Sequence, residues 1–268
     1  LLKVFFLIFF STLLSKNNFS QIVKYSNDFL NIGVDAKYLA QGNCAVASVN
    51  NAAASYWNPA GLLNISEKID ISLMHTELFA GIAKYDYIGA AYKIDTASSV
   101  AFSLIRLGVD DIQNTLNLFD SEGNIDYDRI ELFSVSDYAL LLSYAKKLKI
   151  PGLRIGANAK IIYRHQGEFA NAYGFGIDVG LQYDKNKWHF GAFGKDITST
   201  FNAWFIDLDE YSEILNETGN EIPENSLEIT MPRIILAVNR IFSISDKFSI
   251  SPSFDIDFTF DGKRNVLL

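Results

Sequence analysis

Few side chains in this sequence have the types and spacing that catalysis or metal binding requires. His75 and Glu77 lie two residues apart, so in a strand they share a face and could form part of a metal site. The chain has three histidines and a single cysteine, Cys44, which excludes an internal disulfide and leaves little for a transition-metal site. No serine or aspartate stands in a recognisable arrangement with a histidine for nucleophilic catalysis. We therefore predict no catalytic residues, metal or cofactor, and interpret His75 and Glu77 as an ordinary interface pair.

Charged residues alternate with apolar ones along several segments, which would place them on one face of a strand. These charged residues are predicted to point into the interior of the protein: Arg154, Lys160, Arg164, Asp178, Asp255 and Asp257. There they would pair with each other or with a plug, or line a polar path. Gly174, Gly176 and Gly180 alternate in the same way, and because no helix follows them they do not form a nucleotide motif. We expect them to leave space for a packed segment.

The elements that position these residues are long amphipathic strands. Between residues 248 and 260 the apolar residues fall on one face and the serines and aspartates on the other, and 138–144, 153–164 and 173–183 repeat this alternation. Several segments are about twice the ~5–6 residues usual in soluble sheets and match the ~9–11 residues of a transmembrane strand. The predicted strands are 68–77, 84–94, 98–108, 135–147, 152–165, 171–184, 187–198, 230–243 and 247–260, with a tenth beginning near Asn265.

Composition favours a membrane β-protein over a nucleic-acid-binding one. The chain of 268 residues is 49% hydrophobic and 14% aromatic, with a net charge of -8. Aromatic residues suit strands and membrane-interface belts, whereas the negative charge excludes a nucleic-acid footprint. After residue 20 no apolar run is long enough for a helical span, so a membrane assignment requires a closed barrel of strands.

The joints between the predicted strands alternate in length. Short joints at 95–97, 148–151, 185–186 and 244–246 fall on one side, and the long joints 109–134 and 199–229 fall on the other. Short periplasmic turns with long external loops are typical of outer-membrane barrels. The long joints are acidic, and we interpret them as a solvated acidic surface. The alternative is calcium binding to their carboxylates, but their spacing matches no EF-hand loop.

The two ends of the sequence have separate interpretations. Residues 1–20 combine Lys3 with an apolar run from Val4 to Leu14, which predicts a secretory signal peptide cleaved near Ser20. The alternative is a short membrane anchor, although spanning a bilayer takes ~20 apolar residues. The absence of an initial methionine and the strand-like end at Leu268 lead us to expect a fragment of a longer chain. The predicted location is the outer membrane of a Gram-negative bacterium.

Residues 21–64 do not alternate and are rich in small residues and asparagine, as expected of a plug, or hatch, packed inside a barrel. The run 29–62 is similar to the N-terminal region of the PorV/PorQ family of Bacteroidetes, which belongs to the FadL-like outer-membrane proteins. The residues that carry the resemblance include the hatch motif Gly42, Asn50, Trp57, Asn58, Pro59, Ala60 and Gly61, together with Gly33, Ala36, Ala45, Ala47, Ala53 and Leu62.

The resemblance implies an antiparallel up-and-down barrel of 14 strands with an N-terminal hatch, of which residues 65–268 would supply nine or ten strands. It implies partners as well, namely outer-membrane lipid and either the secretion channel or the cargo of the type IX secretion system. Two other hypotheses remain open at this point. FadL-like relatives move hydrophobic small molecules through the barrel wall, and a soluble periplasmic or surface β-domain would bury the apolar strand faces against each other.

Overall fold

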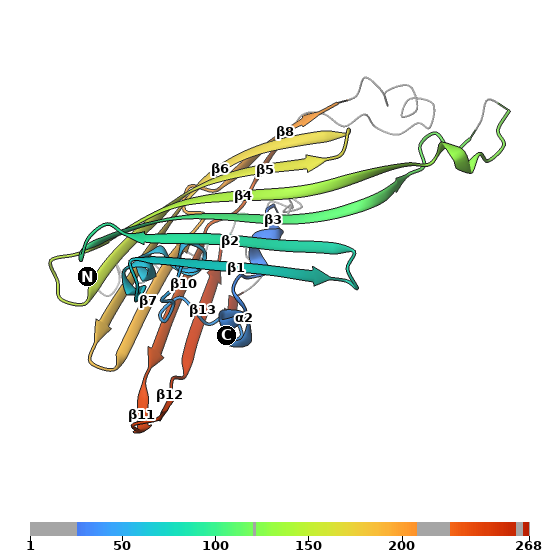
Figure 1. Cartoon of the computed structure of the whole chain (residues 1–268). Helices are drawn as coiled ribbons and strands as arrows, with labels where there is room; N and C mark the ends of the chain where they lie inside the picture. Colours follow the sequence, from blue (N-terminus) through green and yellow to red (C-terminus); the bar gives the residue numbers. More distant parts are fainter. Residues whose placement is uncertain (1–25, 120–121, 208–225, 261–264, 268) are drawn as a thin grey trace, which may run out of the picture.

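The computed structural model describes residues 26–119, 122–207, 226–260 and 265–267. In these ranges the protein is nearly all β, an antiparallel up-and-down sheet with a few short helices (Figure 1). This confirms the predicted all-β, antiparallel class. The predicted signal peptide lies outside the described residues, as do positions 120–121 and 208–225 of the predicted outer loops. Among the described residues, no helix is both long enough and apolar enough to cross a membrane.

Ten strands follow one another across the main sheet in the order β1-β2-β3-β4-β5-β6-β7-β10-β13-β14, while β8 pairs with β6 and β9. Every predicted strand has a counterpart in this sheet. The strands are β1 (Ile69–Leu78), β2 (Ala83–Lys93), β3 (Ser98–Asn114), β4 (Glu131–Lys147), β5 (Leu153–Gln166), β6 (Ala170–Lys185), β7 (Trp188–Lys195), β8 (Phe201–Ile206), β9 (Leu227–Ile229), β10 (Arg233–Arg240), β11 (Phe242–Ser245), β12 (Phe248–Ile250), β13 (Ser253–Thr259) and β14 (Asn265–Leu267).

Alternation along the strands gives the sheet two different faces. In β1, Ile69, Ile71 and Leu73 are 59%, 64% and 72% exposed, whereas the residues between them are partly covered. We call the side that carries these exposed apolar residues the outward face, and the opposite side the inner face. Because successive side chains of a strand point to opposite sides, one pairing register assigns every residue of the sheet to a face.

Two segments that were predicted to be loops include parts of strands. The segment 109–134 is shorter than predicted, because β3 continues to Asn114 and β4 begins at Glu131. The segment 199–229 includes β8 and β9, and β8 pairs with the part of β6 that β7 does not reach. Residues 196–200 form the bulge between β7 and β8, with positive φ angles at Asp196 and Ser199. The alternation of so short a strand after a bulge was not evident from the sequence.

The segment 248–260, predicted to be one strand, is two. Pro252 lacks the N–H that a continuous ladder needs, and the chain breaks at Ser251 and Pro252 between β12 and β13. The side-chain amide of Asn239 donates to the carbonyl oxygens of both residues, which stabilises the break. β11 and β12 consequently form a separate hairpin that projects beyond the main sheet (Figure 1).

Residues 26–65, which we call the hatch segment, form short helices against the inner face. They are η1 (Asp28–Asn31), α2 (Ala36–Ala40), α3 (Ala54–Trp57) and η2 (Pro59–Asn64); a further turn, η3 (Tyr127–Arg129), lies between β3 and β4. The main hydrophobic core joins the hatch segment to β2, β3 and β4 through residues such as Trp57, Leu62, Tyr85, Ile105 and Leu141.

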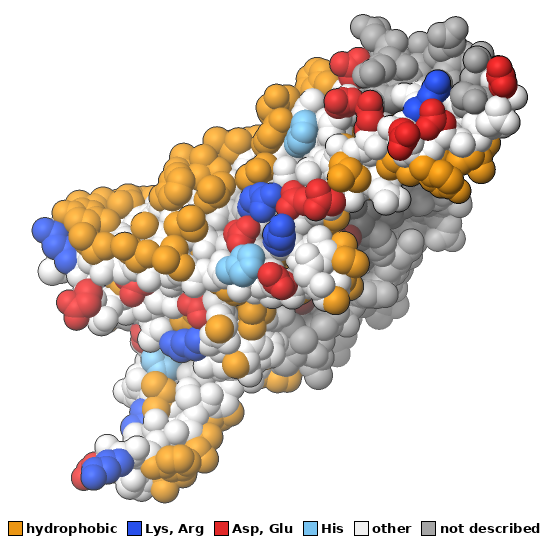
Figure 2. All heavy atoms as spheres, turned by 45° about the vertical axis from the view of Figure 1, so that its right-hand side comes forward, with side chains coloured by type: hydrophobic (Ala, Val, Ile, Leu, Met, Phe, Trp, Pro, Cys, Tyr) orange, Lys and Arg blue, Asp and Glu red, His pale blue; other side chains and the backbone are white. Residues whose placement is uncertain are grey.

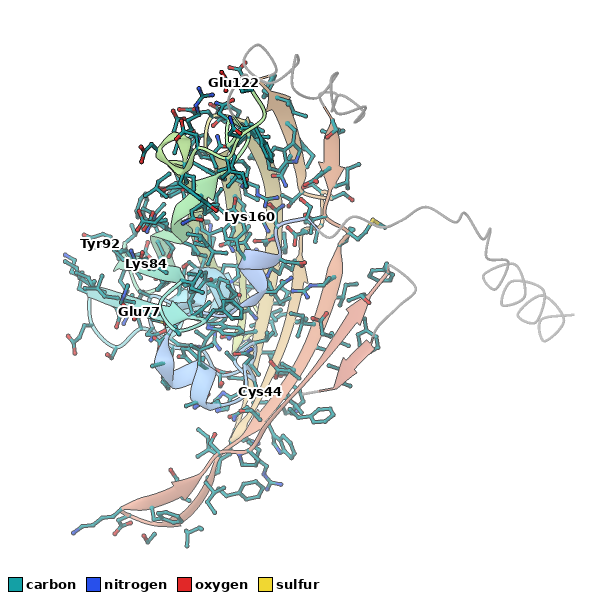
Figure 3. All side chains as sticks on the ribbon, turned by 90° about the vertical axis from the view of Figure 1, so that its right-hand side faces the viewer. Cys44, Glu77, Lys84, Tyr92, Glu122 and Lys160 are labelled. Atoms are coloured by element: carbon teal, nitrogen blue, oxygen red, sulfur yellow. The ribbon has the colours of Figure 1, made fainter. Side chains whose placement is uncertain are left out.

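The sheet curves around the hatch segment. The Ala52 amide donates to Asp70 in β1, and the Val46 amide, six residues earlier, donates to Asp255 in β13. Six residues of chain span at most ~21 Å, whereas the eight strand-to-strand steps from β1 to β13 would span ~38 Å in a flat sheet. The two carboxylates can both reach the hatch segment only because the sheet bends toward it, as Figure 3 shows.

Candidate functional site: the hatch and its contacts with the sheet

Asn58 connects the hatch segment to the middle of the sheet. Its side-chain amide donates to the carbonyl oxygens of Val46 (2.9 Å) and Leu181 in β6 (3.1 Å). Its side-chain oxygen accepts from the Ala60 amide (3.1 Å) and so caps η2, which begins at Pro59. Asn58 is fully buried, so all of these bonds form away from water. One side chain therefore connects two parts of the hatch segment and joins them to β6.

The rest of the Asn-Pro-Ala-Gly turn packs directly on strand glycines. A β-carbon at Gly156 would lie 2.4 Å from the carbonyl carbon of Pro59, and one at Gly180 would lie 2.0 Å from the side-chain oxygen of Asn58. Gly61 faces Val49 within the hatch segment. The prediction that strand glycines leave space for the hatch is correct for Gly180.

The same prediction is wrong for Gly174 and Gly176. The groups that a β-carbon would meet at these positions belong to Asn202 and Thr200. These glycines leave room for side chains at the start of β8 and in the bulge before it. The unpredicted strand β8 is the reason for the error.

The other motif residues maintain the internal structure of the hatch segment. The Trp57 indole donates to the Val34 carbonyl oxygen (2.9 Å), and the Asn50 side chain accepts from the Tyr38 hydroxyl (3.1 Å). Gly42 has a φ of 67° in the turn after α2, a conformation that glycine adopts without strain. Burial raises the pKa of Tyr38 to about 12. Its phenol therefore stays protonated at neutral pH and remains a hydrogen-bond donor.

Tyr56 and Cys44 are held as neutral groups as well. Burial raises the pKa of the Tyr56 phenol, whose hydroxyl donates to the Leu30 carbonyl oxygen (2.6 Å). Burial also raises the pKa of the Cys44 thiol, so Cys44 has none of the thiolate character that a nucleophile needs.

Lys160 is the centre of a buried ionic cluster on the inner face. Its ammonium group contacts Asp178 (3.0 Å) and Asp196 (2.5 Å), and all three side chains are at most 5% exposed. Asp178 also accepts from the Asp196 amide (2.7 Å) and from Asn158, whose side-chain amide in turn donates to the Ser55 carbonyl oxygen (2.7 Å). The cluster thus joins β5, β6 and the bulge to the hatch segment.

The remaining predicted interior charges also lie on the inner face. Arg154 contacts Asp184 (2.7 Å) and Gln182, and Arg164 contacts Asp137 (2.8 Å). Asp255 accepts from the Val46 amide, while Asp257 contacts Arg233 (3.3 Å). The structure therefore brings Lys160 and Asp178 together and gives the other four separate partners.

Sequence reasoning missed several inner-face residues that hold the hatch. Lys195 is buried and donates to the Leu30 carbonyl oxygen (2.7 Å), with its ammonium group over the Tyr56 ring. Gln182 donates to the Val46 carbonyl oxygen (3.0 Å). Asp70 and Lys195 lie on the inner face by the same alternation that identified Lys160, so the signal was present in the sequence.

His75 and Glu77 belong to a second cluster, on the outward face. His75 contacts Asp86 (2.6 Å) and Glu77 (3.9 Å), and Arg106 contacts Asp86 (3.3 Å) and donates to the Tyr138 hydroxyl. Lys84 contacts Asp110 (2.9 Å). We call His75, Glu77, Lys84, Asp86, Arg106 and Asp110 the outward cluster. Figure 2 shows charged side chains of both signs gathered beside the hydrophobic surface.

Among the described residues, no group of three or more His, Cys, Asp or Glu side chains could hold a metal ion. The carboxylates and cations at the centre of the inner face contact each other or the backbone of the hatch segment. Comparison with protein-family models and with curated proteins gave no match to this chain.

Proposed function

We propose that the chain forms part of the wall, and the hatch, of a non-enzymatic outer-membrane β-barrel. Support comes from the outward face, where large apolar side chains are exposed on strand after strand, for example Leu142, Ile161 and Phe175 (46%, 46% and 41%). A soluble protein rarely exposes so continuous an apolar surface, whereas lipid covers it at no cost. The bend of the sheet around the hatch segment fits a wall that closes around a plug.

Aromatic residues on the outward face are spaced as membrane boundaries require. In β6, Tyr173 and Tyr183 are ten residues apart on this face. Ten residues span ~33 Å along a strand, or ~25 Å along the membrane normal at a tilt of ~40°, which matches the apolar band of such barrels. Tyr163 and Tyr138 extend the aromatic surface from Tyr173 across β5 and β4 with stacked or tilted rings.

The position of the outward cluster supports a more specific role for the protein. One row of register partners crosses six strands through His75, Asp86, Arg106, Tyr138, Tyr163 and Tyr173. Tyr92 is the outward-facing aromatic residue near the end of β2 that leads into the short 95–97 joint, and Asp86 is only six residues from it. This separation is ~20 Å along the strand or ~15 Å along the membrane normal. The charged part of this row therefore falls within the apolar band.

The tip of the hairpin that joins β1 to β2 strengthens this argument. Beyond the cluster, the tip exposes Phe79 and Ile82 (79% and 64%), so apolar surface lies on both sides of the charges. Exposed charge on the lipid face of a barrel costs up to ~2–4 kcal/mol per residue at mid-membrane. A protein partner that covers the cluster removes this cost. Three carboxylates against two permanent cations further favour a partner with basic side chains.

We therefore propose a partner-binding, accessory role of the PorV/PorQ type, linked to type IX secretion, in which the wall at β1–β3 meets another membrane protein. The hatch contacts favour this role over passive transport of hydrophobic molecules, because the motif turn packs on strand glycines and the inner charges are paired. Transport would instead need a continuous apolar path beside the hatch.

A partner-retention experiment with the full chain tests the proposal. The test variant combines Asp86→Asn with Arg106→Gln and so alters the outward cluster. The control combines Lys149→Gln with Lys185→Gln, two lysines at the opposite end of the strands. We expect the cluster variant to reach the outer membrane normally, to lose co-purifying protein at least tenfold and to reduce secretion of cargo. Normal secretion after deletion of the gene would refute the secretion role. Extraction of the wild-type protein without detergent would refute the membrane assignment.

A further inference from the structure

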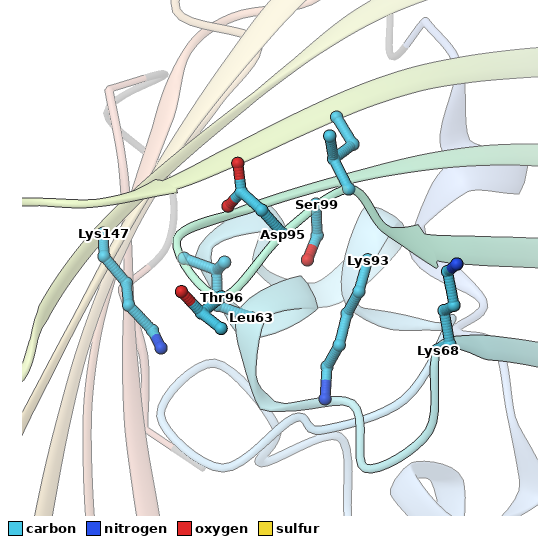
Figure 4. A pocket seen from close by; sticks show the side chains of 8 residues that line it. Leu63, Lys68, Lys93, Asp95, Thr96, Ser99 and Lys147 are labelled. Atoms are coloured by element: carbon cyan, nitrogen blue, oxygen red, sulfur yellow. The ribbon is translucent and has the colours of Figure 1, made fainter.

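A hollow of roughly 380 Å³ lies at the turn end of the sheet, beside the joint between β2 and β3 and below the end of η2 (Figure 4). We call it the turn-end hollow. Its lining includes Leu63, Lys68, Lys93, Asp95, Ser99 and Lys147. Figure 4 shows the three lysines around one space, contributed by three separate segments of the chain.

The three lysines of the turn-end hollow have no acidic partner in the part of the chain that the structure describes. Within the described ranges, none of Lys68, Lys93 and Lys147 forms an ion pair, although ion pairs are frequent elsewhere in the sheet. Lys93 donates to the Ser66 carbonyl oxygen (2.9 Å), and Lys68 lies over the Tyr92 ring. Unpaired positive charge thus gathers at one place in a protein whose net charge is -8.

Asp95 does not neutralise this charge. One of its carboxylate oxygens accepts from the backbone amides of Ala97 (2.6 Å) and Ser98 (2.7 Å) and so holds the turn. With Asp95 ionised, the turn-end hollow retains two positive charges in excess. An anion bound there would be attracted by all three ammonium groups.

Ser99 provides a second, independent indication of a ligand. It is fully buried and lines the turn-end hollow, yet its hydroxyl has no hydrogen-bond partner among the described residues. A buried hydroxyl without a partner is costly, and a ligand or a water in the turn-end hollow would satisfy it. Ser99 pairs with Lys93 across the β2–β3 ladder, so donor and cation lie side by side.

We propose that the turn-end hollow binds the phosphate group of a small molecule. Lysines act on phosphate as point charges from several directions, and a hydroxyl supplies a directed hydrogen bond to one phosphate oxygen. The doubly charged phosphate group matches the two excess positive charges better than a single carboxylate does. The site is independent of the membrane assignment, since phosphate can be titrated against the folded protein in any neutral detergent.

Isothermal titration calorimetry of the full chain with glycerol 3-phosphate, inorganic phosphate and glycerol tests this proposal. We expect the two phosphates to bind and glycerol not to bind. Lys68→Gln combined with Lys147→Gln should weaken binding at least tenfold, and Ser99→Ala several-fold. The matched control, Lys149→Gln combined with Lys185→Gln, alters lysines outside the turn-end hollow and should bind as the wild type does.

Further titrations identify the source of the phosphate and give the results that would overturn the proposal. Tighter binding of a short-chain phosphatidic acid than of glycerol 3-phosphate would identify a lipid headgroup as the source of the phosphate, and equal binding would identify a soluble one. Absence of phosphate binding to the wild type would overturn the proposal, as would equal affinities of the Lys68/Lys147 variant and the control. Binding of an acidic peptide in place of phosphate would also overturn it and assign the surface to a protein.

Discussion

Lys160 on the inner face and Lys84 on the outward face both contact aspartate at about 3 Å, yet 1% of the Lys160 side chain is exposed and 43% of the Lys84 side chain. The inner pair is shielded from water and continues into hydrogen bonds that reach the hatch segment. The outward pair ends in solvent-accessible groups on a surface that is otherwise apolar. The difference indicates two environments for charge, one that fixes the hatch segment to the sheet and one that stays exposed on the outward face.

The largest loss of unfolding free energy is expected from replacing Lys160, the cation of the buried inner cluster. Lys160→Met leaves Asp178 and Asp196 buried without their counter-charge, which typically costs ~3–5 kcal/mol of unfolding free energy. Denaturant unfolding in detergent measures this loss, with Lys149→Met, an exposed turn lysine, as the control. Equal stability of the two variants would show that the inner cluster does not hold the fold.

The next largest loss of folding free energy is expected when a charge is placed in the middle of the outward face. Leu142→Arg should cost ~2–4 kcal/mol in a lipid bilayer, because that position would meet hydrocarbon. Folding into phosphatidylcholine vesicles measures it, with Leu142→Ala as the control for lost packing. If the two variants fold equally well, this part of the outward face does not contact lipid.

Crowding the contact between β5 and the hatch should have a smaller effect. Gly156→Val directs a side chain into the backbone of Pro59 and Ala60, and overpacking of this kind costs ~1–3 kcal/mol. We expect lower stability and faster proteolysis within residues 26–65. Ala157→Val, the next position along β5 but on the outward face, is the matched control. The prediction is wrong if proteolysis of the two variants is indistinguishable.

The smallest effect on stability is expected at the outward cluster. Lys84→Gln removes an ion pair whose side chains are 43% and 34% exposed on the chain alone, and so exposed a pair contributes little to folding. Its unfolding midpoint should not differ measurably from that of Lys149→Gln, while retention of a basic protein partner should rise, because the outward cluster loses one of its two permanent cations. A clear loss of stability would assign the outward cluster a structural role instead.

The strands could be predicted from the sequence because their two faces meet different surroundings, and alternation records that difference residue by residue. The ends of β3 and β4 could not, since alternation fails there: Asp110 and Asp111 are adjacent in β3, where the pairing register shifts, and Leu132 and Phe133 are adjacent in β4. The strand β8 was missed for a tertiary reason, because its pairing with β6 requires the bulge at 196–200 and the space above Gly174 and Gly176.

The candidate sites show the same limit. Alternation alone places Lys160 and Asp178 on the inner face, but their meeting with Asp196 depends on the bulge. His75 and Glu77 were recognisable as a pair, whereas the outward cluster also needs Asp86 and Arg106 from neighbouring strands. Pairing register, which one sequence does not reveal, determines which charges meet.

The assignment of the two faces is tested most directly by single cysteines. Cys44 is the only cysteine of the chain, so Cys44→Ser gives a background for Leu142→Cys and Ile161→Cys on the outward face and Ser143→Cys on the inner face. Each is labelled with an environment-sensitive fluorophore after insertion into vesicles that contain brominated lipid. Lipid contact of the outward face predicts strong quenching at positions 142 and 161 and little at 143. Equal quenching at all three positions, or none at 142 and 161, would contradict it.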